Sequence, residues 1–482
     1  MKNFLKSSIL ILLALCMLFS VVACSRTTDN DETEESSNTV STEDTGLPFE
    51  RMDYGKDLNI YYINWGLYPE FFFEEDSGTV IGKAIIEREY LVKDYLGVNV
   101  VGHLGGNDES VLPTMEPQVL SGLDDYQIYL THCFLSLTAL ITQGYLADFG
   151  DIESIDLEKE YWNYDLMKDL EVQGSMYLGS SDYMIHDPNA IFFNKDVLSQ
   201  YATLDNPYEL VEQGKWTLEK MFSMASQMDA QIEGGSSSDR VYGITGEAEW
   251  QVLSFADSCD TGCLVNDNGY MKLDMGPSNV RYANVFDQID KASDANWFGL
   301  YGSSSKEKLT MDKCTTLFSY ESLKQAYNYK ADGSDVKVGI LPYPKYDEEQ
   351  TEYRSFDWSG FMIIPTSAKD LEMIGKSMEA LAFFSEDTTI EAYYEKVLGT
   401  RIADAPEDAA MLDYIWDGIV SNPAFNFMYN PGGGVNGLFH VVYGMQKMLV
   451  AKLNNQTEVT LSGLWNSYRS SAQSFLDDYL NS

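Results

Sequence analysis

The chain has 482 residues and carries 75 acidic against 32 basic side chains, giving a formal net charge of −43 at pH 7. This balance argues against nucleic acid as a partner, whose phosphates would be repelled, and against direct docking on anionic lipid. Hydrophobic residues make up 44% of the sequence, enough for a folded body, and a body of this length is expected to divide into two lobes.

The N-terminus, residues 1–23, has the pattern of a secretory signal peptide. Lys2 and Lys6 form a basic region, and the apolar stretch that follows has about fourteen residues, too few to span a bilayer as a helix. It ends in Val21-Val22-Ala23-Cys24, which resembles the bacterial lipobox, whose cysteine is acylated (palmitate is one such chain) and becomes the mature N-terminus. Cys24 is therefore the expected lipidation site, and the alternative is a signal that contains a cysteine by chance.

The segment after Cys24 is expected to be a disordered acidic tether, covering residues 24–50. Ser25 to Gly46 holds ten Ser or Thr, seven Asp or Glu, and a single aliphatic residue, Val40. Such a segment buries too little apolar surface to offset its conformational entropy. We expect it to hold the body near the outer face of a bacterial membrane, with the lipid as the only membrane contact.

The first part of the body shows a β-α-β pattern. Asp57 to Ile63 is rich in β-branched and aromatic residues and predicts a strand, and Gly82 to Leu96 has the apolar spacing of a helix. Val98 to Val101 predicts the next strand. A unit of this kind implies a parallel sheet with helices on its faces. The pattern recurs as a strand at Tyr126 to Leu130 and a helix at Leu135 to Gln143.

The later segments continue the α/β pattern. Thr217 is expected to cap a helix that begins at Leu218. From Pro406 onward the chain is expected to be mainly helical. The other predicted elements are strands at 190–193, 336–341 and 360–364 and a helix at 369–384.

Cysteine and histidine give little sign of a metal or disulfide framework. Cys133, Cys259, Cys263 and Cys314 remain in the body and allow three pairings. A small loop or metal site at the Cys259 and Cys263 pair is less favoured than small buried thiols, because no histidine is near. We expect no cofactor and no metal site.

The sequence contains no positive sign of catalysis. The Gly-x-Ser-x-Gly, His-Glu-x-x-His, phosphate-loop and dinucleotide-binding motifs are all absent. A pair of glycosidase carboxylates would be hidden among the 75 acids. We therefore expect a protein that is not an enzyme.

Aromatic residues are abundant, and some are expected at the ends of strands. Ligands of open α/β sheets lie at the carboxyl ends of strands. Trp65, the pair Thr131 and His132, Trp250 and Trp358 occupy or adjoin such ends. A flat ring beside a hydrogen-bonding side chain suits a sugar, and it also suits a peptide or an aromatic solute.

The order of several segments resembles the family 1 extracellular solute-binding proteins of ABC importers. Ala190-Ile-Phe-Phe-Asn-Lys-Asp-Val-Leu198 resembles the signature strand of that family, although Phe193 stands where a tyrosine is usual. The likeness extends over nearly the whole body. Four further segments match in order: Gly174 to Leu178, Trp216-Thr217 with its helix, Val338 to Pro342, and Ser359 to Pro365.

The resemblance implies a two-lobed α/β fold of the periplasmic-binding-protein type II class, with an interlobe cleft and a mainly helical C-terminal segment. By this analogy lobe 1 comprises residues 51–180 plus 338–397, and lobe 2 comprises residues 181–337 plus 398–482. The two lobes would close on a solute and deliver it to a membrane permease.

The resemblance also places candidate ligand-binding residues in the cleft. Trp358 has no counterpart in the family pattern, and the late cleft tryptophan of relatives has none in this sequence. Tyr320 and Glu321 fall in a segment where relatives have a ligand-facing loop. With the strand-end aromatics, the candidate ligand-binding residues are Asn64, Trp65, Thr131, His132, Asp182, Asp187, Asn189, Trp250, Tyr320, Glu321, Trp358 and Asn430.

The resemblance favours one function over two alternatives. We expect a monomeric, lipid-anchored binding protein that captures an extracellular solute, most simply a carbohydrate, for the permease subunits of an ABC importer. The alternatives are a secreted lipoprotein that hydrolyses glycans and a sensing or adhesive lipoprotein of the same fold. The sequence does not name the solute.

Overall fold

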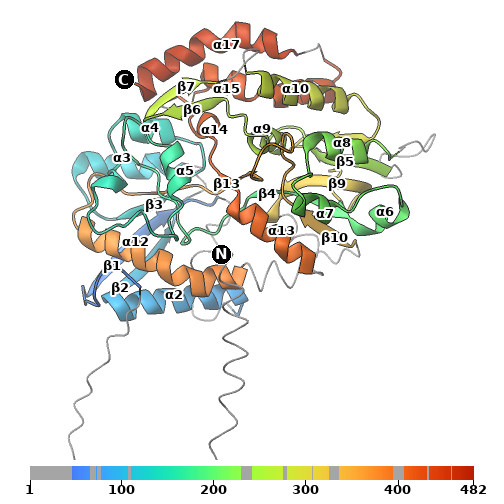
Figure 1. Ribbon diagram of the computed structural model, residues 1–482. Coiled ribbons are helices and arrows are strands. Elements are labelled where there is room, and N and C mark those ends of the chain that lie inside the picture. The colour runs from blue at the N-terminus through green and yellow to red at the C-terminus, as the bar shows by residue number, and fades with distance from the viewer. Residues whose placement is uncertain are drawn as a thin grey trace, which may run out of the picture. The chain divides into compact units, whose positions relative to one another are not determined.

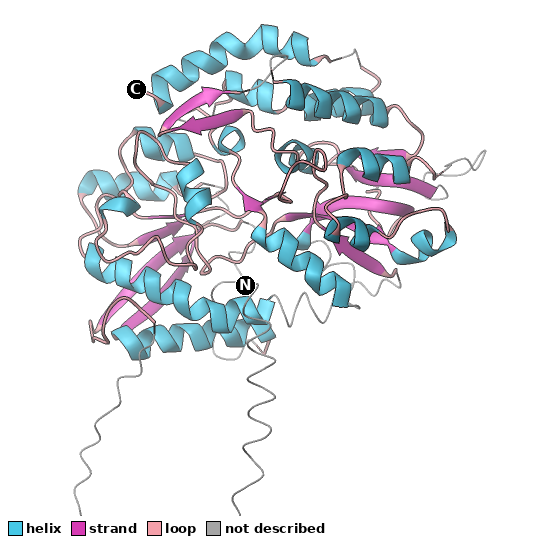
Figure 2. Cartoon of the chain, in the orientation of Figure 1, coloured by secondary structure: helices cyan, strands magenta, loops and turns pink. Residues whose placement is uncertain are grey.

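The computed structural model describes residues 46–65, 72, 78–106, 110–228, 241–274, 279–306, 308–324, 336–393, 406–430, 434–456 and 459–482. Leu47–Ser482 forms one compact unit, in which helices surround separate sheets (Figure 2). The predicted signal peptide, Cys24 and the tether up to residue 45 lie outside the described residues.

The first sheet has the strand order β12-β3-β1-β2. Its strands are β1 (Lys56–Tyr62), β2 (Val98–Leu104), β3 (Ile128–Leu130) and β12 (Met362–Ile363). β1 runs parallel to both β2 and β3, and β12 is antiparallel to β3. The predicted β-α-β unit is confirmed, and β12 returns to this sheet from far along the chain.

Helix α2 (Val80–Leu96) connects β1 to β2 and packs beside α12 (Leu371–Ser385), as Figure 1 shows. The Thr79 side chain accepts a hydrogen bond from the Gly82 N–H and so caps the start of α2. Gly97 ends the helix in the left-handed region at φ 63°, where glycine costs least. The other helices near the first sheet are α3 (Leu112–Ser121), α4 (Leu137–Thr142) and α5 (Tyr164–Asp169).

The second sheet has the strand order β10-β4-β9-β5-β8. β5 runs parallel to both β8 and β9, whereas β4 is antiparallel to β9 and β10 is antiparallel to β4. The amino end of β4 therefore lies at the same edge as the carboxyl ends of β5 and β9. The strands are β4 (Asn189–Asn194), β5 (Val241–Glu247), β8 (Phe298–Tyr301), β9 (Thr315–Ser322) and β10 (Val338–Leu341).

Short helices surround the second sheet. Thr217 caps α8 by accepting a hydrogen bond from the Lys220 N–H at 3.2 Å, which confirms the predicted helix start. The helices are α6 (Lys195–Gln200), α7 (Pro207–Glu212), α8 (Leu218–Ala225), α9 (Ser254–Ser258) and α10 (Val280–Ser293).

The C-terminal region is mainly helical, as predicted. α17 runs beside α15 and continues into a π-helical turn, Leu476–Leu480 (Figure 1). The helices are α13 (Pro406–Asp417), α14 (Pro423–Asn426), α15 (Gly437–Val442), α16 (Gly444–Leu453) and α17 (Leu461–Phe475). Two small sheets complete the unit: β6 (Leu264–Asp267) with β7 (Tyr270–Leu273), and β11 (Ser355–Phe356) with β13 (Ile419–Val420).

Two segments run antiparallel between the sheets. Isolated bridges join Gly179 to Met362 and Pro188 to Asp357. The segment from 179 to 188 leads into β4 of the second sheet, and the segment from 357 to 362 leads into β12 of the first. β10, which the predicted division assigns to lobe 1, pairs with β4 in the second sheet. The return to the first sheet therefore comes after β10, between residues 342 and 362.

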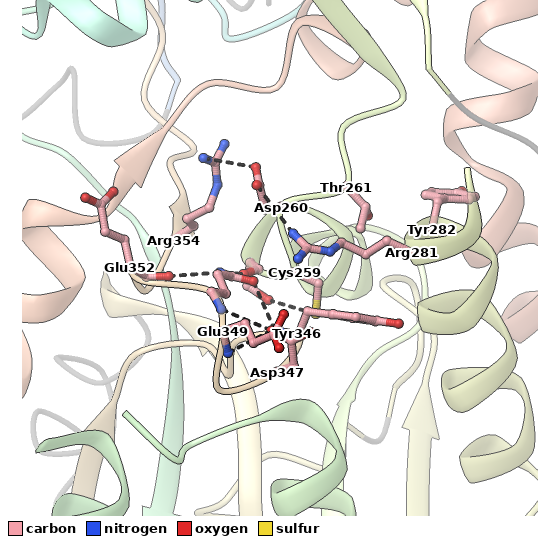
Figure 3. Close-up of polar contacts among 12 residues, drawn as sticks. Cys259, Asp260, Thr261, Arg281, Tyr282, Tyr346, Asp347, Glu349, Glu352 and Arg354 are labelled. Carbon is pink, nitrogen blue, oxygen red and sulfur yellow. Dashed lines mark hydrogen bonds and ion pairs between the residues drawn. The ribbon is translucent and has the colours of Figure 1, made fainter. Parts of the chain in front are cut away.

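Polar contacts attach this returning segment to α9 (Figure 3). Asp260 lies between two guanidinium groups, with Oδ2 at 3.5 Å from Arg281 Nη1 and Oδ1 at 3.2 Å from Arg354 Nη1. Gln350 Nε2 donates to the Ser258 carbonyl at 2.7 Å. Side chains of the returning segment are thus fixed before it crosses to the first sheet.

The four body cysteines, Cys133, Cys259, Cys263 and Cys314, are free and buried, in line with the expectation of small buried thiols. Among the residues that the structure describes, no helix combines the length and the apolar character needed to cross a membrane.

Candidate functional site

A cavity of about 650 Å³ lies where strands of both sheets end. Trp65 follows β1 and His132 follows β3, while Glu247 is the last residue of β5 and Ser322 the last of β9. Strand carboxyl ends of both sheets thus meet at one cavity, the usual place for a ligand in an open α/β sheet.

The lining residues that follow strands form two groups, one at each sheet, which we call the first rim and the second rim. The first rim follows β1 and β3, and the second rim is formed at the ends of β5 and β9. The first rim is Trp65, His132, Phe134 and Leu135, and the second rim is Glu247, Trp250, Gln251, Ser322 and Lys324. The remaining lining residues are Ile185, Asp187, Trp358 and Ser359, from the segments that run between the sheets, and Tyr429, which follows α14.

Aromatic rings from separate elements gather around Phe134. The Phe134 ring is nearly parallel to the rings of Trp250 and Tyr429, with centroids 5.8 Å and 5.4 Å apart and 12° between the planes in both pairs. Trp358 meets Trp250 edge to face at 6.4 Å. These rings present both flat faces and edges to the cavity.

Trp65 lies against the imidazole of His132, with ring centroids 3.7 Å apart. His132 Nδ1 accepts hydrogen bonds from the backbone N–H groups of Phe134 at 3.2 Å and Leu135 at 3.4 Å. Because Nδ1 is an acceptor, the proton of the neutral ring is on Nε2. Burial lowers the pKa of His132 to about 3, so the ring stays uncharged at neutral pH.

Asp187 is held in place by a backbone donor on one side and a carboxylate acceptor on the other. Its Oδ1 accepts the Lys324 N–H at 2.8 Å, and its own N–H donates to Asp357 Oδ1 at 2.8 Å. Burial raises the pKa of Asp187 to about 6; the Lys324 N–H opposes this shift and the charge of Asp357 adds to it.

Asp357 anchors this part of the cavity from behind. Its Oδ2 accepts a hydrogen bond from His186 Nδ1 at 2.6 Å, and its Oδ1 also accepts from the N–H and Oγ of Ser359. Asn163 Nδ2 donates to the other ring nitrogen of His186 at 3.1 Å. Burial lowers the pKa of His186, but the charge of Asp357 and its hydrogen bond outweigh burial, so the pKa is raised overall.

Glu247 is the carboxylate of the second rim. Burial raises its pKa to about 7; the nearby Glu249 adds to this shift, while Lys308 and a hydrogen bond from the Trp250 N–H oppose it. Among the described residues, Glu247 Oε1 has no hydrogen-bond partner although it is buried. The same holds within the described chain for Gln251 Oε1 and for Trp65 Nε1.

Five of the predicted ligand-binding residues line the cavity: Trp65, His132, Asp187, Trp250 and Trp358. The structure brings them together from five different segments. The other seven are not part of the lining: Asn64, Thr131, Asp182, Asn189, Tyr320, Glu321 and Asn430.

Two of these seven support the site from behind. Asn189 Oδ1 accepts the Trp358 Nε1–H at 3.0 Å, and its Nδ2 donates to Ser254 Oγ, so its amide orients the tryptophan. Thr131 Oγ1 accepts the Phe361 N–H at 3.2 Å, which fixes the end of β3 against the chain before β12. Both side chains are fully buried.

The expected ligand-facing loop around Tyr320 and Glu321 is instead part of the buried strand β9, paired with β4 and β5. Tyr320 donates its hydroxyl to the Glu247 carbonyl at 3.2 Å, and its ring occupies the space that a side chain on Gly246 would need. Glu321 Oε1 accepts from Ser319 Oγ within the same strand.

The last three lie in other surroundings. Asn64 is exposed, beside Trp65. Asp182 donates its N–H to the Tyr161 carbonyl at 2.9 Å, and burial raises the pKa of its carboxyl to about 7. The Asn430 N–H donates to the Gly434 carbonyl, which closes its own loop; residues 431–433 are outside the described chain.

The sequence reasoning missed nine lining residues. Glu247 and Ser322 end strands, so the strand-end rule would have found them if β5 and β9 had been predicted. Phe134 follows His132 by two residues. The full set is Phe134, Leu135, Ile185, Glu247, Gln251, Ser322, Lys324, Ser359 and Tyr429.

Several solved structures that resemble this chain are ABC solute-binding proteins. The Listeria monocytogenes substrate-binding protein Lmo0181, in complex with cycloalternan, aligns at a TM-score of 0.53 and 12% identity, covering 87% of this chain and 99% of that chain. The maltose-binding protein MalE of Listeria monocytogenes, in complex with maltose, aligns at a TM-score of 0.55 and 13% identity. The alignment covers 88% of this chain and 98% of that chain. A solute-binding protein of Thermotoga lettingae, bound to α-D-tagatose, aligns at a TM-score of 0.52 and 13% identity. The alignment covers 87% of this chain and 100% of that chain.

No protein-family model and no curated protein matches the sequence. The structural likeness establishes the fold: the chain has the two-lobed α/β fold of ABC solute-binding proteins, as the sequence resemblance predicted.

Proposed function

We propose that the protein is the substrate-binding component of an ABC importer and that the cavity between its two rims captures a carbohydrate. The fold supports the receptor role, and the structural relatives were solved with cycloalternan, maltose and α-D-tagatose. The cavity volume of about 650 Å³ is in the range of small-molecule sites.

One observation carries the proposal. Within the described chain, buried polar atoms without a hydrogen-bond partner lie among the aromatic rings of the cavity: Trp65 Nε1 is a donor, and Gln251 Oε1 is an acceptor. Buried polar groups are normally paired, because leaving one unpaired costs about 1–3 kcal/mol. A sugar offers an apolar C–H face to the rings and hydroxyls that both accept and donate.

The lobes and their movement belong to the same proposal. We place the lobes as the resemblance implies, residues 51–180 plus 338–397 for lobe 1 and residues 181–337 plus 398–482 for lobe 2, except that β10 (Val338–Leu341) belongs to lobe 2 because it pairs with β4. The cavity draws its lining from both sheets, so closure of the lobes would bring the rims together around the solute and exclude water.

We extend the proposal to location and partners. The lipobox-like segment ending at Cys24 supports a lipid anchor on the outer face of the cell membrane, with the acidic tether allowing the body to reach its permease subunits. Labelled palmitate tests the anchor: the wild type should incorporate it, and Cys24→Ser should lose both the label and the membrane fraction.

Glycan hydrolysis is the second candidate, because Asp187 and Glu247 place two carboxyl groups in one cavity, with pKa values raised to about 6 and about 7. A thermal-shift screen with mono- and oligosaccharides, peptides and polyamines separates the candidates. A receptor is stabilised by one sugar class, which is recovered unchanged. Stabilisation that fades as product accumulates would replace the receptor by a hydrolase. No stabilisation by any sugar would contradict the carbohydrate proposal.

A further inference from the structure

We propose that the solute carries a positively charged amine, as an amino sugar does, with its ammonium group against the Glu247 carboxylate and its ring on the aromatic side chains of the cavity. This inference rests on the proposed function and narrows its substrate class. The ammonium group is the chemical feature that the cavity would recognise.

The charges of the lining are unevenly compensated. Among the lining residues that the structure describes, the charged side chains are Asp187, Glu247 and Lys324. Lys324 compensates the charge of Asp187: its backbone N–H donates to the Asp187 carboxylate at 2.8 Å, and its side-chain charge favours the ionised form. His132 adds no charge, because burial lowers its pKa and its Nδ1 accepts two backbone N–H groups. Glu247 is therefore the carboxylate in the cavity that most needs a cation.

The geometry around Glu247 fits an ammonium group. Trp250 follows Glu247 by three residues, and its backbone N–H favours the ionised carboxylate. Oε1 of this carboxylate is buried and has no hydrogen-bond partner within the described chain. An ammonium group placed there would donate to Oε1 in a charge-assisted hydrogen bond. The Trp250 ring, which belongs to the same lining, would be available for a cation–π contact.

Other groups near Glu247 do not supply the missing donor. Four side chains influence or are influenced by its charge: Glu249 along the chain, Lys308 before β9, Tyr301 of β8 and Tyr320 of β9. Lys308 lowers the pKa of Glu247 and Glu249 raises it, so their effects oppose each other. Tyr320 donates its hydroxyl to the Glu247 backbone carbonyl. The net charge of −43 further favours the approach of a cation.

Matched ligands test the inference directly. Full-length protein in a detergent without sugar groups is titrated calorimetrically with the β-1,4-linked glucosamine disaccharide, its N-acetylated form, cellobiose and spermidine. We expect the amine disaccharide to bind at least about tenfold more tightly than either neutral disaccharide, with the difference shrinking as salt is added. Spermidine, which has charge but no ring, should bind more weakly than the amine disaccharide.

Two variants test whether Glu247 is the source of the preference for the amine disaccharide. Glu247→Gln should bring the ratio of amine to neutral affinity close to one, since the amide keeps the size but loses the charge. Glu219→Gln removes a charge from an exposed position on α8 and should leave the ratio as in the wild type.

Proton release gives a test on the wild type alone. An ammonium beside Glu247 favours the ionised carboxylate and lowers its pKa from about 7. At about pH 5.5, where the sugar amine is already protonated and takes up little further proton, the amine disaccharide should therefore release a fraction of a proton on binding, seen as a dependence of the heat on the buffer, and cellobiose should release less.

The outcomes separate this inference from the proposed function. Neutral sugars that bind as tightly as the amine overturn the inference but leave the carbohydrate receptor standing. Spermidine binding more tightly than the amine disaccharide also overturns it. Absence of binding by every sugar overturns both.

Discussion

The two rims of the cavity occupy equivalent positions in their sheets but differ in chemistry. In the first rim Trp65, His132 and Phe134 present rings, and burial keeps His132 uncharged. In the second rim Glu247 and Lys324 add charge beside Trp250. A ligand that satisfies both needs a flat apolar face on one side and a polar or charged edge on the other. The fold supplies the positions, and the residues placed there decide the ligand.

The largest effect is expected at the support between the rims. Asp357 accepts hydrogen bonds from His186, from the Asp187 N–H and from both the N–H and Oγ of Ser359. Asp357→Ala leaves these donors unpaired in a buried site and should lower the free energy of unfolding by about 3–5 kcal/mol. Chemical denaturation measures this, with Asp417→Ala, at an exposed position of α13, as the control. A loss below about 1 kcal/mol would show that the network is not a structural support.

The next largest effect is expected on sugar affinity when a ring of the first rim is removed. Trp65→Ala removes a ring of the first rim that packs on His132 at 3.7 Å. We expect binding of the sugar to weaken by about 2 kcal/mol, or roughly 30-fold, as for a central aromatic anchor. Trp465→Ala removes an indole from α17, outside the lining, and should leave the affinity unchanged. Equal effects of the two substitutions would mean that the first rim does not contact the ligand.

A smaller effect concerns pH. The folded protein raises the pKa of Glu247 from 4.5 to about 7, so the folded state binds the proton more tightly than the unfolded state does. The resulting stability is fully present below about pH 4.5 and is lost as the pH rises through about 7. Between these pH values, the melting temperature of the wild type should therefore fall relative to that of Glu247→Gln. If the melting temperatures of the wild type and of Glu247→Gln changed in parallel with pH, the pKa of Glu247 would be the same in the folded and unfolded states, which would contradict the raised value.

The smallest effect is expected away from the cavity, at the contacts of Asp260 with Arg281 and Arg354 (Figure 3). Asp260→Asn keeps a residue that tolerates the backbone φ of 52° but removes the charge. Both guanidinium groups are about one third exposed, so stability should fall by only about 0.5 kcal/mol, and the difference should fade in salt. A loss larger than that of Asp357→Ala would reverse the proposed ranking.

The sequence predicted most of the framework because the local signals were strong. The β1-α2-β2 unit follows from alternation and from the apolar spacing between Thr79 and Gly97, and the cap at Thr217 is confirmed. β9 was missed and its central part was expected to be a loop. Its residues are buried on both faces, so no alternation marks the strand, and its pairing with β4 and β5 is a long-range property.

The site was predicted in part, for a related reason. Trp65 and His132 could be placed by the rule that ligands bind near strand ends, and Asp187 by the family resemblance. Asn189 lies close to these residues, but its amide points to Trp358 and Ser254, and a one-dimensional pattern does not show such an orientation. Glu247 is one of 75 acidic residues, and only the fold distinguishes it from the others.

Titration of intrinsic tryptophan fluorescence with the sugar panel tests the central claim most directly, because Trp65, Trp250 and Trp358 line the cavity. We expect a saturable spectral change with one class of sugar, with its midpoint shifted to roughly 30-fold higher sugar concentration in Trp65→Ala and unshifted in Trp465→Ala, and with the sugar recovered intact. A midpoint in Trp65→Ala equal to that of the wild type, or no change with any sugar, would contradict a carbohydrate site between the two rims.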